Sequence, residues 1–283
     1  MATFNNYATL SYRGITTVSN LVSGEVIESL HMTKTAVNDV YARNGHVTFA
    51  VGIVNAGGTE ISGLILSDDL GAYTVGTSVV TPLSYTENSA KHYVNGVLQP
   101  APAVSAGPPL RITDIAVPGN GSVILVYDTT ANEYAPLACD ESIINSATLS
   151  GGNLSEPLQA SAEASPDCRA NLSISKFINP SIVPEDGHLT YTFVISNYGG
   201  TPAEAGDEVA VRDVFDPVLQ DIAVTLDGEP MTTAQYDYAP ATGVFSTRPG
   251  AIVVPAAVSG RDPDSGVWTT TPGTVMLVIS GTI

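Results

Sequence analysis

The chain has 283 residues and a formal net charge of −18, and 43% of its residues are hydrophobic. A surface of this charge repels phosphate groups and anionic lipids, so we expect no nucleic-acid partner and no binding to membrane surfaces. The hydrophobic content is too high for an intrinsically disordered chain, and no apolar run is long enough to insert into a bilayer. The length favours two domains over one.

The two ends of the sequence show no recognisable sorting signal. Residues 1–6 have neither the basic segment nor the apolar segment of a secretory signal peptide, and no anchor precedes Ile283. If the protein reaches an extracellular, cell-surface or spore-surface location, we therefore expect it to do so by another route.

Short alternating runs of Thr, Val, Ile, Ser and Tyr recur along the chain and predict β-strands. In residues 189–195, every second side chain is apolar, while Thr190 and Thr192 lie between them, which gives one core face and one largely solvated face. Asn95-Gly96 and Asp227-Gly228 are typical of hairpin turns. Helix signals are nearly absent, so we predict an all-β fold of the sandwich type.

The most informative feature is an internal repeat. Three pairs of segments align: 34–59 with 176–201, 64–68 with 209–213, and 121–126 with 273–278. The first pair aligns without a gap and includes Lys34 with Lys176, which are two of only three lysines in the chain. The sequence therefore predicts two tandem copies of one Ig-like β-sandwich.

The second copy contains a lysine-bearing strand, then Gly-x-x-Thr-Tyr-Thr-Phe-x-Ile-x-Asn-x-Gly, then Val-x-Val-x-Asp. This pattern resembles the bacterial conserved-repeat domain, an Ig-like sandwich known as domain of unknown function, family eleven. The resemblance covers most of the second copy and, more loosely, the first, and it implies a structural or adhesive role in a repetitive surface protein. The residues that carry it are Lys176, Gly187, Thr190, Tyr191, Phe193, Ile195, Asn197, Gly199, Val209, Val211 and Asp213.

The first copy ends in a strand that the second copy lacks. Residues 143–150 are predicted to form that strand, and the second copy stops at Ile283 without an equivalent. Residues 4–11 repeat it, with identical residues at five positions and the same apolar face. We therefore predict an N-terminal donor strand whose polymerisation residues are Phe4, Asn6, Ala8, Leu10 and Tyr12, and an acceptor edge at Val275, Leu277 and Ile279.

The repeated strand can complete the second sandwich in two ways. A third possibility is that the alignment of the two segments is accidental. The N-terminal strand can fold back onto the second sandwich of its own chain, or it can insert into the second sandwich of a neighbour. Residues 12–30 would then link the donor strand to the first sandwich, as residues 151–172 link the two sandwiches. This parallel favours the neighbour. The predicted domains are a donor strand and linker (1–25), a first sandwich (26–152), a linker (153–172) and a second sandwich lacking its last strand (173–283).

Two pairs of residues suggest covalent chemistry. Cys139 and Cys168 can form one disulfide or remain free thiols, and the sequence leaves both open. Lys34 and Lys176 begin the two copies, and such a lysine can form an isopeptide bond with an asparagine that has a carboxylate beside it. The candidate acceptors are Asn55 and Asn197, with Asp68 and Asp213 as helpers. The alternative is that each lysine is a solvated strand residue stabilised by the nearby carboxylates.

Motifs for catalysis, phosphate binding and dinucleotide binding are absent from the sequence. His46 and His188 occupy repeated positions, but each begins a strand in a different domain, so we expect neither a metal site nor a cofactor. The segment 262–266 is acidic, and we interpret it as a polar hairpin tip rather than a calcium loop.

We therefore predict a non-enzymatic structural subunit of a bacterial extracellular or spore-surface filament. In this fimbria-like assembly, donor-strand complementation joins the subunits head to tail, so the partner is a second copy of the chain. The alternative is a monomeric adhesive or ligand-binding surface module, whose target the sequence does not specify.

Overall fold

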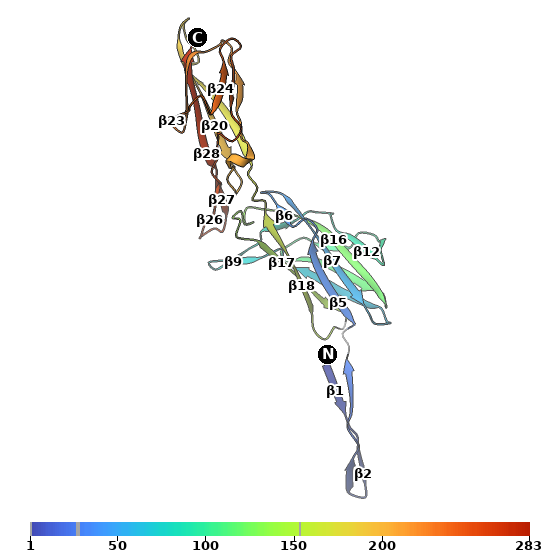
Figure 1. Ribbon diagram of the computed structural model, residues 1–283. Coiled ribbons are helices and arrows are strands. Elements are labelled where there is room, and N and C mark those ends of the chain that lie inside the picture. Colours follow the sequence, from blue (N-terminus) through green and yellow to red (C-terminus); the bar gives the residue numbers. More distant parts are fainter. Residues whose placement is uncertain (1, 27–28, 153) are drawn as a thin grey trace.

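The computed structural model describes residues 2–26, 29–152 and 154–283 (Figure 1). Apart from one short 3₁₀ helix, η1 (Ala205–Asp207), the regular structure in these ranges consists of β-strands, which confirms the all-β prediction. In Figure 1 a thin N-terminal ribbon, a first sandwich and a second sandwich follow one another along an extended molecule. None of the helical structure in the described ranges is long and apolar enough to cross a membrane.

The N-terminal ribbon is a β-hairpin that projects away from the first sandwich (Figure 1). Its tip is Arg13-Gly14, where both residues have positive φ angles, as a tight two-residue hairpin turn requires. Its first arm contains strands β1 (Ala2–Asn6) and β2 (Thr9–Tyr12). Its return arm contains β3 (Ile15–Val18), which pairs with β2, and β4 (Val22–Val26), which pairs with β1. The donor segment thus pairs with residues 15–26 of its own chain, which we had expected to be a linker, and it does not pair with the second sandwich.

The first sandwich consists of two sheets of six strands each. The first sheet contains β5 (Leu30–Ala36), β7 (His46–Asn55), β11 (Leu83–Tyr85), β12 (Lys91–Val94), β13 (Val97–Leu98) and β16 (Gly121–Ala131). The second contains β6 (Val40–Tyr41), β8 (Ile61–Asp68), β14 (Ala103–Ser105), β15 (Leu110–Val117), β17 (Ile143–Gly151) and β18 (Leu158–Pro166). A small hairpin of β9 (Tyr73–Val75) and β10 (Ser78–Val80) lies beside them.

The second sandwich repeats this plan with fewer strands. Its larger sheet has the order β19 (Leu172–Asn179), β20 (His188–Asn197), β28 (Gly273–Thr282), β22 (Gln220–Leu226) and β23 (Glu229–Pro230). Its smaller sheet has the order β21 (Arg212–Val214), β25 (Val244–Thr247) and β24 (Tyr236–Ala239), and a hairpin joins β26 (Val258–Arg261) to β27 (Trp268–Thr271).

Alternating side chains build the two cores, as the sequence periodicity predicts. Val47, Phe49, Val51 and Ile53 of β7 are fully buried, while the intervening side chains face outward. Strand β20 buries Leu189, Phe193 and Ile195 in the same way. Aromatic rings dominate the second core, where Phe215 packs against Tyr191, Tyr238 and Phe245.

The hairpin β26–β27 of the second sandwich contacts the first. The backbone N–H of Trp268 donates to the carbonyl of Glu133 at 2.9 Å, and the Arg43 guanidinium donates to the carbonyl of Trp268 at 2.7 Å. The Arg261 guanidinium lies 5.5 Å from the centre of the Tyr73 ring. These contacts help to fix the orientation of one sandwich on the other.

Candidate functional site: an open edge in the second sandwich

The two sandwiches differ beside one pair of equivalent strands. In the first, β8 lies between β15 and β17. Its repeat partner in the second sandwich is β21, which pairs with β25 on one side and with no described strand on the other. The position that β17 fills in the first sandwich is therefore open in the second, and the backbone on this side of β21 pairs with no described strand. The N–H of Val214 donates instead to Oδ1 of Asp213.

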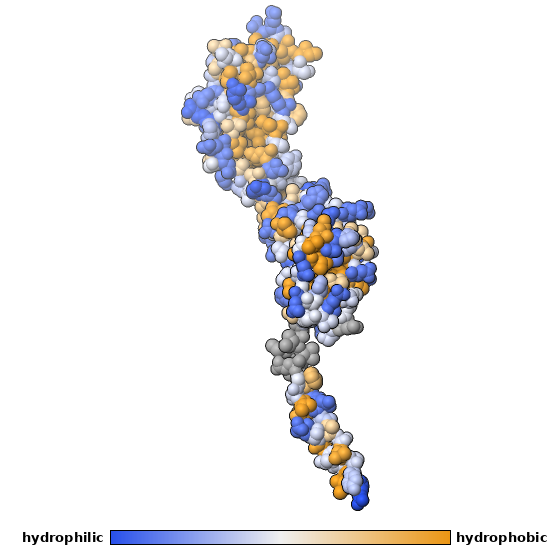
Figure 2. Space-filling model, turned by 90° about the vertical axis from the view of Figure 1, so that its right-hand side faces the viewer, coloured by the Kyte–Doolittle hydropathy of each residue, from blue (hydrophilic) through white to orange (hydrophobic). Residues whose placement is uncertain are grey.

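The same difference is seen on the facing sheet. In the first sandwich, β5 alternates between buried and exposed residues, and β18 of the β17–β18 hairpin packs against it. In the second, every residue of β19 is exposed. Met32 of β5 is 6% exposed, whereas Ile174 at the equivalent position of β19 is 54% exposed. Leu172, Phe177 and Ile178 also face solvent, and Figure 2 shows apolar side chains gathered along this sandwich.

The predicted acceptor residues do not lie on this edge. Val275, Leu277 and Ile279 belong to β28, which pairs with β20 on one side and with β22 on the other, and all three side chains are buried. The prediction that they form the acceptor edge is wrong. The alternation of the sequence showed that these side chains face the core, but it does not show whether a strand is central or at an edge.

The predicted donor residues lie in the projecting hairpin and are exposed. Phe4, Asn6, Ala8, Leu10 and Tyr12 all face solvent. Further exposed apolar side chains on the hairpin are Tyr7, Ile15, Val18, Leu21 and Val22. An isolated two-stranded ribbon is only marginally stable in water, and an uncovered apolar surface of this kind is a candidate for binding.

The hairpin β17–β18 of the first sandwich shows what such a segment does when it is docked. Ile143, Asn145, Ala147 and Leu149 of β17 are buried, and the residues between them are not. In the sequence repeat these four positions align with Phe4, Asn6, Ala8 and Leu10. The donor residues therefore occupy the positions whose counterparts point into the first core.

Beneath β17 lies a buried polar cluster. The Lys34 ammonium donates to Oδ2 of Asp68 at 2.5 Å, and the Tyr127 hydroxyl donates to the same oxygen. The side chains of Lys34 and Asp68 are 0% and 1% exposed. Asn145 is buried beside Tyr127, and neither its Nδ2 nor its Oδ1 has a hydrogen-bond partner among the described residues.

Burial shifts the pKa values of two members of this cluster. Loss of hydration lowers the pKa of Lys34, and this effect outweighs the attraction of Asp68. Burial also raises the pKa of the Tyr127 hydroxyl, and the carboxylate of Asp68 adds to the rise. The cluster therefore combines an amine with a lowered pKa, a carboxyl group and an amide without hydrogen bonds.

The second sandwich contains only part of this cluster. The Lys176 ammonium donates to Oδ2 of Asp213 at 2.5 Å, as in the first pair, but the two side chains are 40% and 18% exposed. The ammonium lies 4.3 Å from the centre of the Tyr191 ring, much as Lys34 lies 4.9 Å from Phe49, the equivalent residue. The counterpart of Asn145 is not part of this sandwich, because it belongs to the strand position that is open.

Asn55 and Asn197, the predicted isopeptide acceptors, have another role. Asn55 donates through Nδ2 to the carbonyls of Thr59 and Val117 and accepts from the N–H of Gly57. Asn197 makes the same pattern of bonds in its own loop. In the strand pairing, Lys34 lies opposite Val51, four residues from Asn55, which is about 13 Å along a strand. The prediction that these asparagines are the acceptors is wrong, because they brace loops.

Cys139 and Cys168 lie at the junction of the two sandwiches and are bonded as a disulfide. The bond joins the loop before β17 to the segment after β18. Gly200 of the second sandwich packs directly on Cys139, where a side chain would collide with the sulfur atom. The disulfide therefore stabilises the end of the docked hairpin where the chain passes into the second sandwich.

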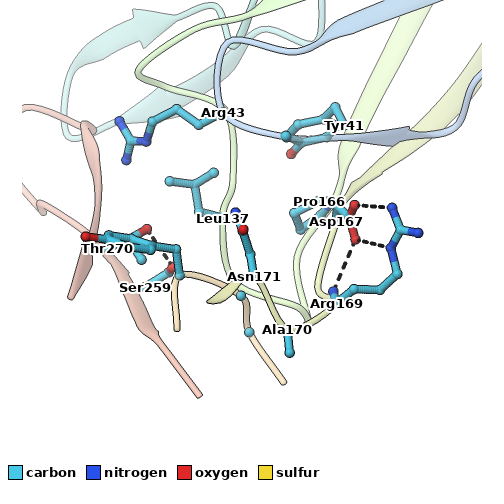
Figure 3. A pocket seen from close by; sticks show the side chains of 14 residues that line it. Tyr41, Arg43, Leu137, Pro166, Asp167, Arg169, Ala170, Asn171, Ser259 and Thr270 are labelled. Carbon is cyan, nitrogen blue, oxygen red and sulfur yellow. Dashed lines mark hydrogen bonds and ion pairs between the residues drawn. The ribbon is translucent and has the colours of Figure 1, made fainter. Parts of the chain in front are cut away.

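A cleft of about 650 Å³ also lies at this junction (Figure 3). Its lining includes Tyr41 and Arg43 from the first sandwich and Thr270 from the second. The Arg169 guanidinium donates to both carboxylate oxygens of Asp167, at 2.9 and 2.6 Å, and these bonds lower the pKa of Asp167 to about 2. This exposed ion pair lies at the rim, and the described lining residues offer no nucleophile with a base beside it.

The remaining candidates for metal binding are dispersed. His46 and His188 begin β7 and β20 in different sandwiches. Asp262 accepts hydrogen bonds from Asp264 and Ser265 at the tip of the β26–β27 hairpin, as a polar turn does. Within the described ranges, His, Cys, Asp and Glu side chains form no group of three or more that could hold a metal ion.

Comparisons with known proteins show similarity of fold only. No family model and no curated protein matches the chain, so the resemblance to the conserved-repeat domain stays a prediction. Solved structures that match include the major pilin of Bacillus cereus (11% identity, 96% of this chain, 73% of that chain, TM-score 0.39). Another is a major pilin fragment of Streptococcus agalactiae (13% identity, 88% of this chain, 91% of that chain, TM-score 0.36). A third is the pilus backbone protein of Streptococcus pneumoniae (10% identity, 87% of this chain, 55% of that chain, TM-score 0.35). This chain spans about half of the pneumococcal protein, and TM-scores this low carry no argument about function.

Proposed function

We propose that this protein is the structural subunit of an open homopolymer. In this assembly the N-terminal hairpin of one copy inserts into the open side of the second sandwich of the next copy. The observation that carries the proposal is the pair β17–β18, which fills in the first sandwich the position that is open in the second. The hairpin repeats the sequence of β17, projects from the molecule and exposes its apolar side chains. We further propose that the polymer is a bacterial surface or spore-surface filament.

The pairing of β17 with β8 gives the register of the proposed joint. Ala147 lies opposite Asp68, and Leu149 lies opposite Leu66. When the repeat is applied to both strands, Ala8 of one subunit lies opposite Asp213 of the next, and Leu10 lies opposite Val211. In this register Phe4, Asn6, Ala8 and Leu10 point into the second core.

The return arm of the hairpin has a role of its own in this arrangement. In the first sandwich, β18 pairs with β17, and its inward side chains pack against the core that β5 helps to form. The arm β3–β4 would pair with β1–β2 in the same way and cover the exposed side chains of β19. The inserted element is therefore a complete hairpin, rather than the single donor strand predicted from the sequence.

The connections between elements fit a continuous string of equivalent sandwiches. Five residues separate β18 from β19, and three separate β4 from β5. In Figure 1 the hairpin projects from the end of the first sandwich that is remote from the second, so successive subunits would follow one another in a line. The contact is heterologous, and it therefore propagates without limit unless the rotation between subunits closes a ring.

Apolar burial and strand pairing must supply the free energy of this joint. Each subunit has a formal charge of −18, so neighbouring subunits repel one another. Burial of a large side chain such as Phe4 or Leu10 stabilises the joint by about 1.5–3 kcal/mol. The exposed side chains of β19 would add to this gain.

Electron microscopy and size-exclusion chromatography of the full chain test the proposal. We expect filaments from the unaltered protein and monomers from Leu10→Asp, because an inward aspartate would be buried without a partner. Ser11→Asp is the matched control. This variant adds the same charge on the outward face of the strand, so it should leave assembly intact. A folded, unaltered chain that stays monomeric at high concentration would instead support the monomeric surface module.

A further inference from the structure

We propose that the inserted hairpin is attached covalently to its acceptor. In this bond, Nζ of Lys176 of one subunit is joined as an amide to Cγ of Asn6 of the next subunit, and Asp213 transfers the proton. This inference rests on the proposed function, because only insertion of the hairpin brings the two residues together.

The first sandwich provides the arrangement on which the inference is based. Lys34 of β5 and Asp68 of β8 form a buried ion pair, and Tyr127 donates to the same Asp68 oxygen. Asn145 of β17 is buried in the same core beside Tyr127. A buried amide with no hydrogen-bond partner among the described residues costs free energy, and the amide of Asn145 lies in the same core as the buried amine of Lys34 and the buried carboxyl group of Asp68. This set of groups has a direct chemical use, because an amine can attack an amide carbon when an acid supplies a proton to the leaving nitrogen.

The second sandwich holds two of the three groups in the same geometry. The distance from Lys176 Nζ to Asp213 Oδ2 is 2.5 Å, equal to that between Lys34 and Asp68. An aromatic ring lies beside each ammonium. The missing group is the amide, which β17 supplies in the first sandwich.

The hairpin carries this amide at the required position. Asn6 aligns with Asn145, and the two are identical in an otherwise divergent part of the strand. Asn145 is two residues from Ala147, which lies opposite Asp68. Asn6 is likewise two residues from Ala8, which would lie opposite Asp213. Insertion would also bury Lys176 and Asp213, whose present exposure of 40% and 18% reflects the open side.

The reaction balances without any other reactant. Lys176 gives a proton to the Asp213 carboxylate and becomes a neutral amine, and its nitrogen attacks Cγ of Asn6. A C–N bond forms and the original C–N bond of the side-chain amide breaks. The side-chain nitrogen of Asn6 takes two protons, one returned by Asp213 and one released by the attacking nitrogen, so it leaves as ammonium and Asp213 ends as the carboxylate. The joint becomes lighter by the mass of one ammonia, about 17 Da.

The test uses filaments of the full chain, first seen by electron microscopy and then boiled in detergent with a reductant. We expect a ladder of multimers that survives this treatment. Trypsin should release residues 1–13 joined to residues 170–212, less the mass of one ammonia and with no cleavage after Lys176. In Asn6→Ala and Lys176→Arg filaments, the ladder and the joined peptide should both be lost. Asn5→Ala is the matched control, because Asn5 is on the outward face.

Each outcome decides a different point. Filaments of the unaltered chain that dissolve completely into monomers would overturn the covalent bond and leave the proposed function standing. A chain that forms no filaments would contradict the proposed function and, with it, the bond. The first sandwich offers an internal reference, because the same reaction would join Lys34 to Asn145 within every monomer, whether or not it assembles.

Discussion

Lys176 and Asp213 form an ion pair in the second sandwich with the same 2.5 Å separation as Lys34 and Asp68 in the first, yet the second pair is open to solvent. The lysine and carboxylate positions are thus preserved between the copies, while the strand that covers them is not. This relationship is the reason we propose the uncovered side of the second sandwich as the functional site. The N-terminal hairpin, which repeats the sequence of β17, is the element proposed to fill it.

The first prediction compares equivalent positions of β5 and β19. Met32→Ala should lower the free energy of unfolding of the monomer by about 2–5 kcal/mol, because Met32 is packed in the first core. Ile174→Ala should change it by less than about 0.5 kcal/mol, since Ile174 is exposed in the monomer. In the filament Ile174 would be covered, so Ile174→Ala should weaken assembly. Denaturant titration and sedimentation measure the two effects, and a large loss of monomer stability in Ile174→Ala would be the contrary result.

The second prediction tests the register of the joint. Thr148 lies opposite Ser67 in the first sandwich, so Thr9 of one subunit should lie opposite Arg212 of the next, both facing outward. Thr9→Cys combined with Arg212→Cys, in a Lys176→Arg background that prevents amide formation, should give multimers that disappear on reduction. Non-reducing electrophoresis makes the measurement.

The control for this register moves one cysteine by two residues. Ser11→Cys with Arg212→Cys keeps both thiols on the outward face but separates them along the strand, so multimers should be scarce. Equal crosslinking by the two pairs would show that the hairpin has no fixed register on β21.

The third prediction concerns the disulfide between Cys139 and Cys168, which are 29 residues apart in the sequence. Closing a loop of this length stabilises a fold by about 3–4 kcal/mol in the chain-entropy account. Replacing both cysteines with serine should therefore lower the melting temperature of the monomer. Addition of a reductant should lower it to a similar extent in the unaltered protein and leave the double variant unchanged. If reduction has no effect on melting, the junction does not depend on this bond.

Much of the fold could be predicted from the sequence, because its signals are local. The alternation in residues 189–195 predicted β20, and the aligned segments around Lys34 and Lys176 predicted two related sandwiches. The aspartates at 68 and 213 were recognised as partners of the lysines for the same reason. Each of these features depends on residues that repeat along one strand or between the two copies.

The errors concern features that depend on sheet topology. Asn55 and Asn197 were predicted as isopeptide acceptors because the repeated Asn-x-Gly-Gly sequence is conspicuous in both copies. Their side-chain amides instead form hydrogen bonds with the backbone of that loop. The acceptor edge was misplaced because periodicity identifies the buried face of a strand and not its neighbours. The identity of Asn6 with Asn145 is visible in the alignment, but the burial of Asn145, on which its proposed reaction rests, is seen only in the structure.

The return arm of the hairpin could not have been found by alignment. Residues 15–26 share no clear pattern with β18, whose inward positions are mostly alanine. A covering strand needs only small or apolar side chains on one face and backbone groups to pair with its neighbour. The amino-acid sequence of a covering strand is therefore only weakly constrained, although its backbone must pair with the neighbouring strand.

A cryo-EM reconstruction of the assembled protein tests the central claim most directly. The account predicts two added strands in the second sandwich, continuous with β5 of the next subunit, with the first arm beside β21 and Asn6 facing Lys176. A map in which the hairpin lies outside the second sandwich, or in which another segment of the same chain pairs with β21, would contradict it.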